Sequence, residues 1–383
     1  MTLNTYKPNF FNFFCVFLFF IFFSCYLTSP IITYGFQIIG LGVLGGLVFI
    51  RTGYSIYVVN SIYFIAFSFL MVLISLIQSF YLIHQDILWL QVFRILFWCF
   101  ICYISCPFLV RVNVIDYERA LKSTILILSI ALIYQSCSFF LFGYFIDYSS
   151  LIGGVPSRIY FNDVFRPSGL TSEPAIHSGV MIGLLTLLFI LNKNCRPYFM
   201  LGLVSIFLSM SVLGILMGVC FIVLVLLADK KIKALPLIIL FVLVVLFLTG
   251  DILLARYDTF LSGGDSSNAT KIVSFTNMLE NDALLYLGYG FNGSTENTPW
   301  FYEGLYDVTA YGSFIIAFGI PIGILVLLFF LMMISRLNFS FTEKALVCLV
   351  FVKITLPILC FFVFFVVVVL IFSKRKVYSN VIS

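Results

Sequence analysis

The run FFNFFCVFLFFIFFSCYL, residues 10–27, decides the fold class of this chain. Its side chains are almost all apolar, and its length approaches the roughly 20 residues that a helix needs to cross the hydrocarbon core of a bilayer. It exceeds the apolar core of a signal peptide and no small-residue cleavage site follows it, so we expect a retained helix.

The composition of the whole chain agrees with this run. Of its 383 residues, 62% are hydrophobic and 10% are charged, and its mean hydropathy is +1.16. A soluble domain is about a quarter charged. No soluble fold of this length could bury so much apolar surface, so lipid must solvate most of it. The sequence predicts an all-α polytopic membrane protein.

About twelve transmembrane helices are expected, and the positions of Lys and Arg orient them, because cytoplasmic loops are enriched in these residues. The basic clusters share one side only if 197–228 and 345–373 each form a tight helical hairpin. Both termini are then cytoplasmic. The expected spans are 10–28, 32–50, 56–80, 87–110, 122–143, 176–192, 197–211, 213–228, 234–250, 309–335, 345–357 and 358–373. The clusters are Lys7, Arg51, Arg111 with Arg119 and Lys122, Lys193 with Arg196, Lys230 with Lys231 and Lys233, Arg336 with Lys344, and Lys374 to Lys376.

Two long loops, 144–175 and 251–308, fall on the outer, periplasmic side of this arrangement. Long connections are where function concentrates. Twelve of the sixteen acidic residues lie outside, but of the bases only four do: Arg158, Arg166, Arg256 and Lys271. We therefore expect any functional site in these loops. Within the second loop, Gly288-Tyr-Gly-Phe-Asn-Gly293 matches the dinucleotide-binding pattern GxGxxG. It lacks the following helix and the cytosolic setting, so we interpret it as a flexible loop.

The stretch FRPSGLTSEPAIHSG, residues 165–179, gathers charge in an apolar chain. Thr171 or Ser172 can cap the following helix, and Glu173 would then share one helical face with His177. The simpler interpretation is a capped helix start with a carboxylate favoured by the helix dipole. That interpretation explains the Ser, Glu and Pro residues but not Arg166 or His177.

In the second loop, Arg256 follows a helix end and Lys271 follows a glycine-rich stretch. Each alone could be a solvated cation at the lipid headgroup boundary. Three bases, Arg166 included, converging among so many acids instead indicate a binding site for an anion.

These motifs resemble those of one known family. The pattern Arg166-x-x-Gly-x-x-x-Glu173-Pro is similar to a segment of the Wzy O-antigen polymerases. The second loop, with Arg256, Lys271 and Leu-Gly-Tyr-Gly-Phe at 287–291, looks like their other large periplasmic loop, and the helix 311–323 also looks familial. The resemblance implies the membrane architecture shared with O-antigen ligases and related to the GT-C glycosyltransferases. Relatives often carry Arg where this chain has Lys271, and Lys cannot make the same bidentate contact.

The resemblance implies a polymerase that joins lipid-linked oligosaccharides on the periplasmic face of the bacterial inner membrane. The residues fit this chemistry. The expected cytoplasmic loops are too short to hold a nucleotide-sugar domain, so the sugar donor must already be attached to lipid. Arg166, Arg256 and Lys271 would bind the diphosphate of an undecaprenyl diphosphate donor. As its negative charge grows, these cations would stabilise the transition state. Glu173 is the expected base for the acceptor hydroxyl, with His177 as its orienting partner or replacement.

Two other functions stay open at this point. An O-antigen ligase would use the same donor with lipid A–core as acceptor. A lipid-linked oligosaccharide flippase ranks third, because it should line a central cavity with polar and charged residues, and the spans hold almost none apart from Arg94, Lys353 and small polar residues. We expect no cofactor, no metal and no nucleic acid. A chain-length regulator protein is a candidate partner.

Overall fold

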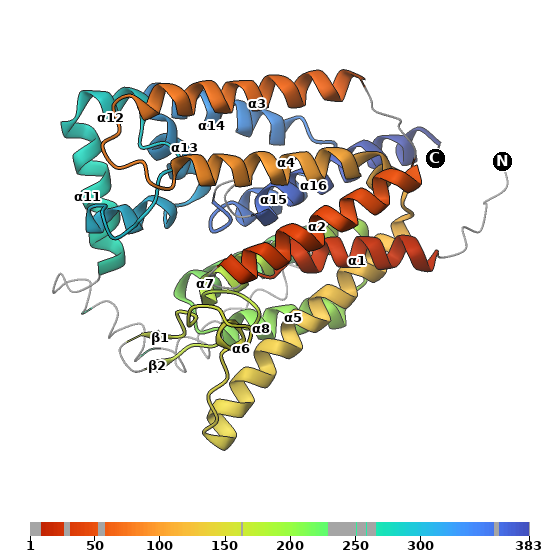
Figure 1. Ribbon diagram of the computed structural model, residues 1–383. Helices are drawn as coiled ribbons and strands as arrows, with labels where there is room; N and C mark the ends of the chain where they lie inside the picture. Colours follow the sequence, from red (N-terminus) through yellow and green to blue (C-terminus); the bar gives the residue numbers. More distant parts are fainter. Residues whose placement is uncertain are drawn as a thin grey trace.

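The computed structural model describes residues 9–26, 31–52, 58–161, 164–228, 250, 258, 266–355 and 360–382, and these form a helical bundle (Figure 1). Three of the described helices, α4, α5 and α7, are long and apolar enough to cross a membrane. The apolar helices indicate a membrane protein, as the composition predicts. The helices of the first half are α1 Phe10–Ser24, α2 Ile31–Thr52, α3 Val58–Ser79, α4 Leu88–Arg111, α5 Val114–Phe142, α6 Tyr148–Leu151, α7 Pro174–Leu191, α8 Arg196–Leu208 and α9 Val212–Ala228.

The second half continues with α11 Ser266–Glu280, α12 Asp282–Leu287, the 3₁₀ helix η2 Trp300–Tyr306, α13 Ala310–Phe318, α14 Ile320–Ser335, α15 Phe341–Val350 and α16 Cys360–Ile382. Among the described residues, the regular strands are a short antiparallel pair, β1 Tyr160–Phe161 and β2 Val164–Phe165.

Several predicted spans correspond to single helices, and the hairpin predicted for 197–228 is confirmed. Helices α8 and α9 are joined by a tight turn in which Met210 has a positive φ of 50°. The predicted span 234–250 lies outside the described residues, apart from position 250. Helix α5 begins eight residues earlier than expected, at Val114 rather than at 122.

The prediction of one span over 309–335 is wrong, because the helix breaks at Gly319. Its φ of 77° is readily adopted by glycine. The glycine motif of the second loop, residues 288–293, forms hydrogen bonds to the end of the helix at this break. The Tyr289 amide donates to the Ile316 carbonyl, and the Gly290 amide donates to the Ala317 carbonyl. Tyr289 is fully buried. The expectation of a flexible loop there is therefore also wrong, since this segment satisfies carbonyls that the broken helix leaves without partners.

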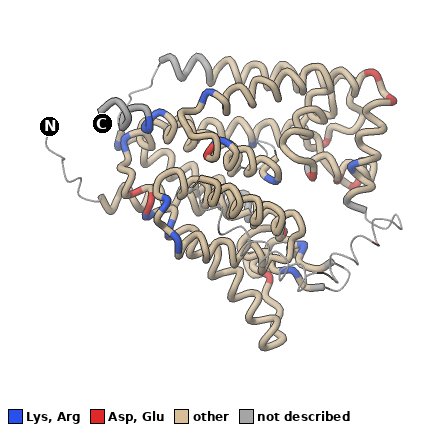
Figure 2. The backbone as a smooth tube through the Cα atoms, turned by 180° about the vertical axis from the view of Figure 1, so that it is seen from behind, with Lys and Arg blue, Asp and Glu red and all other residues tan. Residues whose placement is uncertain are grey.

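The bundle has two unlike ends. At one of them, here called the basic end, most Lys and Arg residues gather where α4 and α16 finish and α5 starts (Figure 2). Arg375 of α16 donates there to the carbonyls of Leu109, Val110 and Val112 at the end of α4. These carbonyls have no partner within their own helix, so Arg375 both satisfies them and complements the helix dipole.

The opposite end, here called the loop end, carries the elements from the two predicted loops. In Figure 1, β1, β2, α6, α11 and α12 lie on the side of the bundle away from the end of α16. For the basic clusters and the parts of the two loops that lie in the described residues, the predicted separation holds in three dimensions; Lys7 and the cluster at 230–233 lie outside them.

Helix α7 is the centre of the bundle and positions the site. Almost all of its residues are buried, and it packs against α5, α8, α9, α15 and α16. Glycines allow these close approaches: a Cβ on Gly183 would lie 2.6 Å from the ring of Phe361, and one on Gly179 would lie 3.1 Å from Cβ of Lys353. Small residues at helix contacts are typical of membrane bundles.

Candidate functional site

The first turn of α7 presents Glu173 at the loop end. Glu173 is the residue that precedes the helix, and Pro174 occupies the first helical position, where its missing amide costs nothing. The backbone carbonyl of Glu173 accepts hydrogen bonds from the amide of His177 and the hydroxyl of Thr171. The expectation that Thr171 or Ser172 caps the helix is wrong, because Glu173 holds that position and its carboxylate makes no capping bond. The carboxylate is instead directed outward from the helix start.

Lys353 faces Glu173 from the residues that follow α15. Its Nζ lies 3.9 Å from Glu173 Oε1 and 2.8 Å from Asp307 Oδ1, and its side chain is only 9% exposed. The stem of Lys353 passes over Gly179, and the Phe351 carbonyl accepts the amide of Ala310, which fixes this turn against the start of α13. A buried ammonium requires anionic partners, and here two distant segments supply them.

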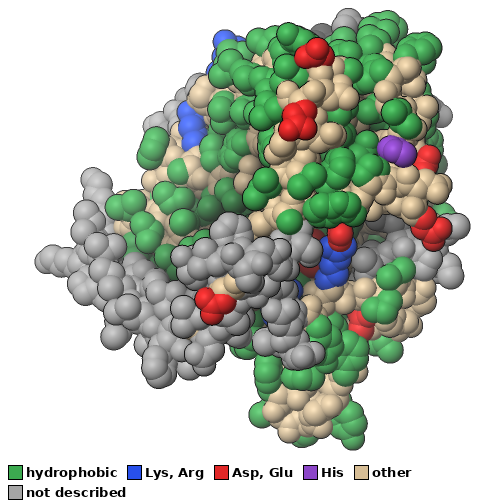
Figure 3. Space-filling model, turned by 90° about the vertical axis from the view of Figure 1, so that its left-hand side faces the viewer, with side chains coloured by type: hydrophobic (Ala, Val, Ile, Leu, Met, Phe, Trp, Pro, Cys, Tyr) green, Lys and Arg blue, Asp and Glu red, His purple; other side chains and the backbone are tan. Residues whose placement is uncertain are grey.

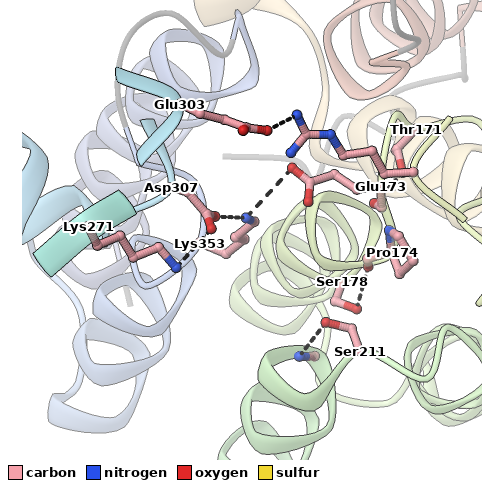
Figure 4. A network of polar contacts seen from close by, with 11 residues as sticks. Thr171, Glu173, Pro174, Ser178, Ser211, Lys271, Glu303, Asp307 and Lys353 are labelled. Atoms are coloured by element: carbon pink, nitrogen blue, oxygen red, sulfur yellow. Dashed lines mark hydrogen bonds and ion pairs between the residues drawn. The ribbon is translucent and has the colours of Figure 1, made fainter. Parts of the chain in front are cut away.

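Asp307 also binds Lys271, so it joins two cations. Lys271 Nζ lies 2.8 Å from Asp307 Oδ2, while Lys353 holds the other oxygen. Burial alone would raise the pKa of Asp307, but the ammonium groups of Lys353 and Lys271 hold that pKa well below its usual range. The second loop places these residues: α11 carries Lys271, and Asp307 directly follows η2. Figure 4 shows the four side chains directed toward one another: Lys271 from α11, Glu173 from the residue before α7, and Asp307 and Lys353 from the segments that follow η2 and α15.

A second ion pair adjoins this network. The Arg158 guanidinium of the first loop binds the Glu303 carboxylate of η2, so the two predicted loops contact each other through opposite charges. Both side chains are at least half exposed, so this pair contributes little to stability by itself. It shows which segments of the two loops face each other. Figure 3 views the loop end directly and shows basic and acidic side chains meeting near the middle of a largely apolar face.

His177 lies on another side of α7. Its ring is buried, and Nε2 lies 3.2 Å from the hydroxyl of Ser205 on α8. Residues 177 and 179 are two apart and so point to roughly opposite sides of a helix. Gly179 contacts Lys353, whereas His177 faces α5 and α8. The predicted pairing of the two side chains on one face is therefore not what the structure shows: Glu173 and His177 are joined through the backbone only, and His177 is directed into the bundle.

The segment that carries Arg166 is held by a buried glutamine. Gln135 Oε1 of α5 accepts the amides of Ser168 and Gly169, at 3.0 and 2.8 Å. Gly169 has a φ of 58°, the left-handed conformation that the glycine of this motif favours. The Arg166 amide donates to the Ile159 carbonyl, which continues the β1–β2 hairpin, and its side chain is half-buried.

Of the five predicted site residues, the structure brings Glu173 and Lys271 into one network. Arg166 lies on the neighbouring hairpin segment, His177 faces the interior, and Arg256 lies outside the described residues. Sequence reasoning missed Asp307 and Lys353. Lys353 carried a usable signal, because an ionisable residue within an apolar segment is expensive and suggests a functional role. Asp307 gave no signal in the sequence, since it is one of many acidic residues in a long loop.

An apolar groove is lined in part by residues that are close to the network in the sequence. Its volume is about 430 Å³, and it is lined by residues of α9, α13 and α15 together with Val352, the residue before Lys353. Tyr311, four positions after Asp307, also lines it. Two residues of the groove lining, Val352 and Tyr311, are thus within four positions of Lys353 and Asp307 in the chain.

Comparisons with known proteins returned nothing: no family model, no curated protein and no solved structure matched this chain.

Proposed function

We propose that this chain is a membrane glycosyltransferase of the Wzy type, which joins oligosaccharide repeat units carried on undecaprenyl diphosphate at the periplasmic face of the inner membrane. The observation that carries the proposal is the network Lys271–Asp307–Lys353–Glu173. It brings a carboxylate from the end of the first predicted loop within ion-pair distance of a cation that also contacts the second.

The chemistry assigns a role to each side of the network. An acceptor sugar hydroxyl attacks the anomeric carbon of the donor, a new C–O bond forms, and the bond from that carbon to the diphosphate breaks. The hydroxyl proton passes to the Glu173 carboxylate. The lipid diphosphate leaves with the electron pair, and cations of the two loops stabilise its charge. Lys271 is one of these, with Arg166 and Arg256 as further candidates. His177 supports the position of α7 from within the bundle.

The apolar groove supports a lipid-linked donor. A polyprenyl chain requires an apolar path beside the site that binds its diphosphate, and the groove lined by Val352 and Tyr311 offers one. The segregation of basic residues supports the outer location, because the network lies at the end opposite the clusters that the positive-inside rule assigns to the cytoplasm.

The lipopolysaccharide profile of a strain lacking only this protein tests the proposal. Loss of a polymerase should leave core bearing a single repeat unit and no ladder. Bare core with accumulated lipid-linked polymer would instead indicate a ligase. Failure to deliver repeat units to the periplasm would indicate a flippase. An unchanged ladder would reject all three assignments.

A further inference from the structure

Asp307 is arranged between two ammonium groups as a bound anion would be. Each of its carboxylate oxygens lies 2.8 Å from one lysine Nζ: Oδ2 from Lys271 and Oδ1 from Lys353. A phosphate group carries several anionic oxygens and can accept from two donors in the same way. The two lysines come from α11 and from the turn that follows α15, so the protein must fold to bring them to one anion.

The exposure of the three residues shows from which side an anion could enter. The side chain of Lys353 is 9% exposed and forms the floor, whereas the side chains of Lys271 and Asp307 are 25% and 36% exposed. Asp307 is the most open of the three and follows the last residue of η2, outside any regular helix. An incoming anion would therefore meet Asp307 first and compete with it for both lysines.

We infer that Lys353 and Lys271 form a clamp for one phosphate group of the substrate, and that Asp307 occupies this clamp when no substrate is bound. The inference deepens the proposed function, on which it rests, by naming Lys353 as a substrate-binding residue and Asp307 as the competing anion. It differs from a purely structural ion-pair network in one respect: the carboxylate of Asp307 opposes ligand binding.

Opposite effects of neighbouring substitutions follow from this arrangement. Asp307→Asn removes the competing charge and keeps the side-chain shape, so affinity for phosphate groups should rise by about tenfold or more. Lys353→Met and Lys271→Met each remove a charged donor, so affinity should fall by a similar factor. Glu118→Gln is the matched control. It neutralises a lysine-paired carboxylate, that of the Glu118–Lys122 pair on α5, at the basic end.

The experiment measures binding to the purified full-length protein in detergent by isothermal titration. The ligands are inorganic pyrophosphate, geranyl diphosphate and sulfate. Wild type should bind pyrophosphate, Asp307→Asn should bind it more tightly, both lysine variants should bind it more weakly, and Glu118→Gln should match wild type. Tighter binding of geranyl diphosphate than of pyrophosphate assigns the clamp to a lipid-linked diphosphate, whereas equal affinity assigns it to a free phosphate compound.

Several results would overturn the clamp. These are weaker or unchanged pyrophosphate binding by Asp307→Asn, no binding by wild type and Asp307→Asn alike, or equal affinity for sulfate. If Asp307→Asn does not fold, Lys271→Met decides, because it keeps the Lys353–Asp307 pair: unchanged binding by this variant rejects the proposal. The proposed function fails separately. A deletion strain that keeps its ladder rejects the polymerase, even if pyrophosphate binding follows the expected pattern.

Discussion

The basic end and the loop end of this bundle both contain Lys and Arg, but they pair them differently. At the basic end, each cation has its own partner: Arg375 binds carbonyls at the end of α4, Lys122 binds Glu118 one turn away, and Lys376 binds Glu343 of α15. At the loop end, Lys353 binds carboxylates from two segments far from it in the chain. Cations of the first kind satisfy helix ends and orient the chain. Cations of the second kind share carboxylates, since Asp307 binds both Lys271 and Lys353, and so join several segments into one network.

The largest expected difference between the two ends is in activity. Glu173→Gln keeps the size and polarity of the side chain but removes the proposed base, so turnover should fall by about a hundredfold to ten-thousandfold. Glu118→Gln at the basic end should leave turnover unchanged. The length of the lipopolysaccharide ladder at equal protein level measures both. A full ladder from Glu173→Gln would place the base elsewhere.

The second largest expected difference between the two ends is in the free energy of unfolding. Lys353→Met removes a nearly buried cation from Glu173 and Asp307. Asp307 keeps Lys271 and both carboxylates are about a third exposed, so we expect a cost of about 1.5–3 kcal/mol, as for hydrogen bonds to charged groups. Lys122→Met breaks a pair within one helix whose lysine is 27% exposed, and such a pair contributes at most about 1 kcal/mol. Thermal unfolding of both variants in the same detergent compares them. Equal shifts in Tm would show that the loop-end network is no more buried in solution than the pair on α5.

A pair of glycine substitutions tests how the loop end is assembled. Gly319→Ala forces a φ of 77° on a residue with a Cβ, and that atom would lie 2.4 Å from the Tyr286 carbonyl carbon. The backbone conformation alone costs about 1–3 kcal/mol. Gly46 is inside α2 with no atom within 4 Å of its Cβ position, so Gly46→Ala should stabilise by about 0.5–1 kcal/mol. The midpoints of thermal unfolding should therefore move in opposite directions, and a Gly319→Ala variant as stable as wild type would exclude the break at this residue.

The smallest effect concerns pH. The pKa of Asp307 is lower in the folded protein than its ordinary value of 3.8, so its contribution to stability is fully present well above 3.8 and is lost as pH falls through the folded pKa. The difference in Tm between wild type and Asp307→Asn should stay constant from pH 7 to about pH 5 and shrink below about pH 4. A difference that already declines between pH 7 and pH 5 would show that the two lysines do not hold Asp307 in its charged form.

Parts of the candidate site could be predicted from local sequence. Glu173 and Lys271 were found because their loops are long and their types match the chemistry. The glycine of the first motif also fits its place, since Gly169 has a positive φ, which glycine adopts most readily. By contrast, the hydrogen bonds of Gln135 to Ser168 and Gly169 were not foreseen, because a glutamine inside an apolar helix gives no indication of its partner.

The sequence by itself determined that this chain is a helical membrane protein with its basic residues gathered at one end. A long apolar segment partitions into lipid and a charged segment stays in water, and this partition depends on the composition of each segment and not on the rest of the fold. Only the tertiary structure decided that Lys353 joins Asp307 and Glu173, that His177 faces Ser205, and that the helix predicted over 309–335 breaks at Gly319. Those features depend on which surfaces of distant segments meet. A buried cation pairs with the anion that helix packing places close to it. Its partner therefore depends on the assembled bundle and not on the neighbouring residues in the sequence.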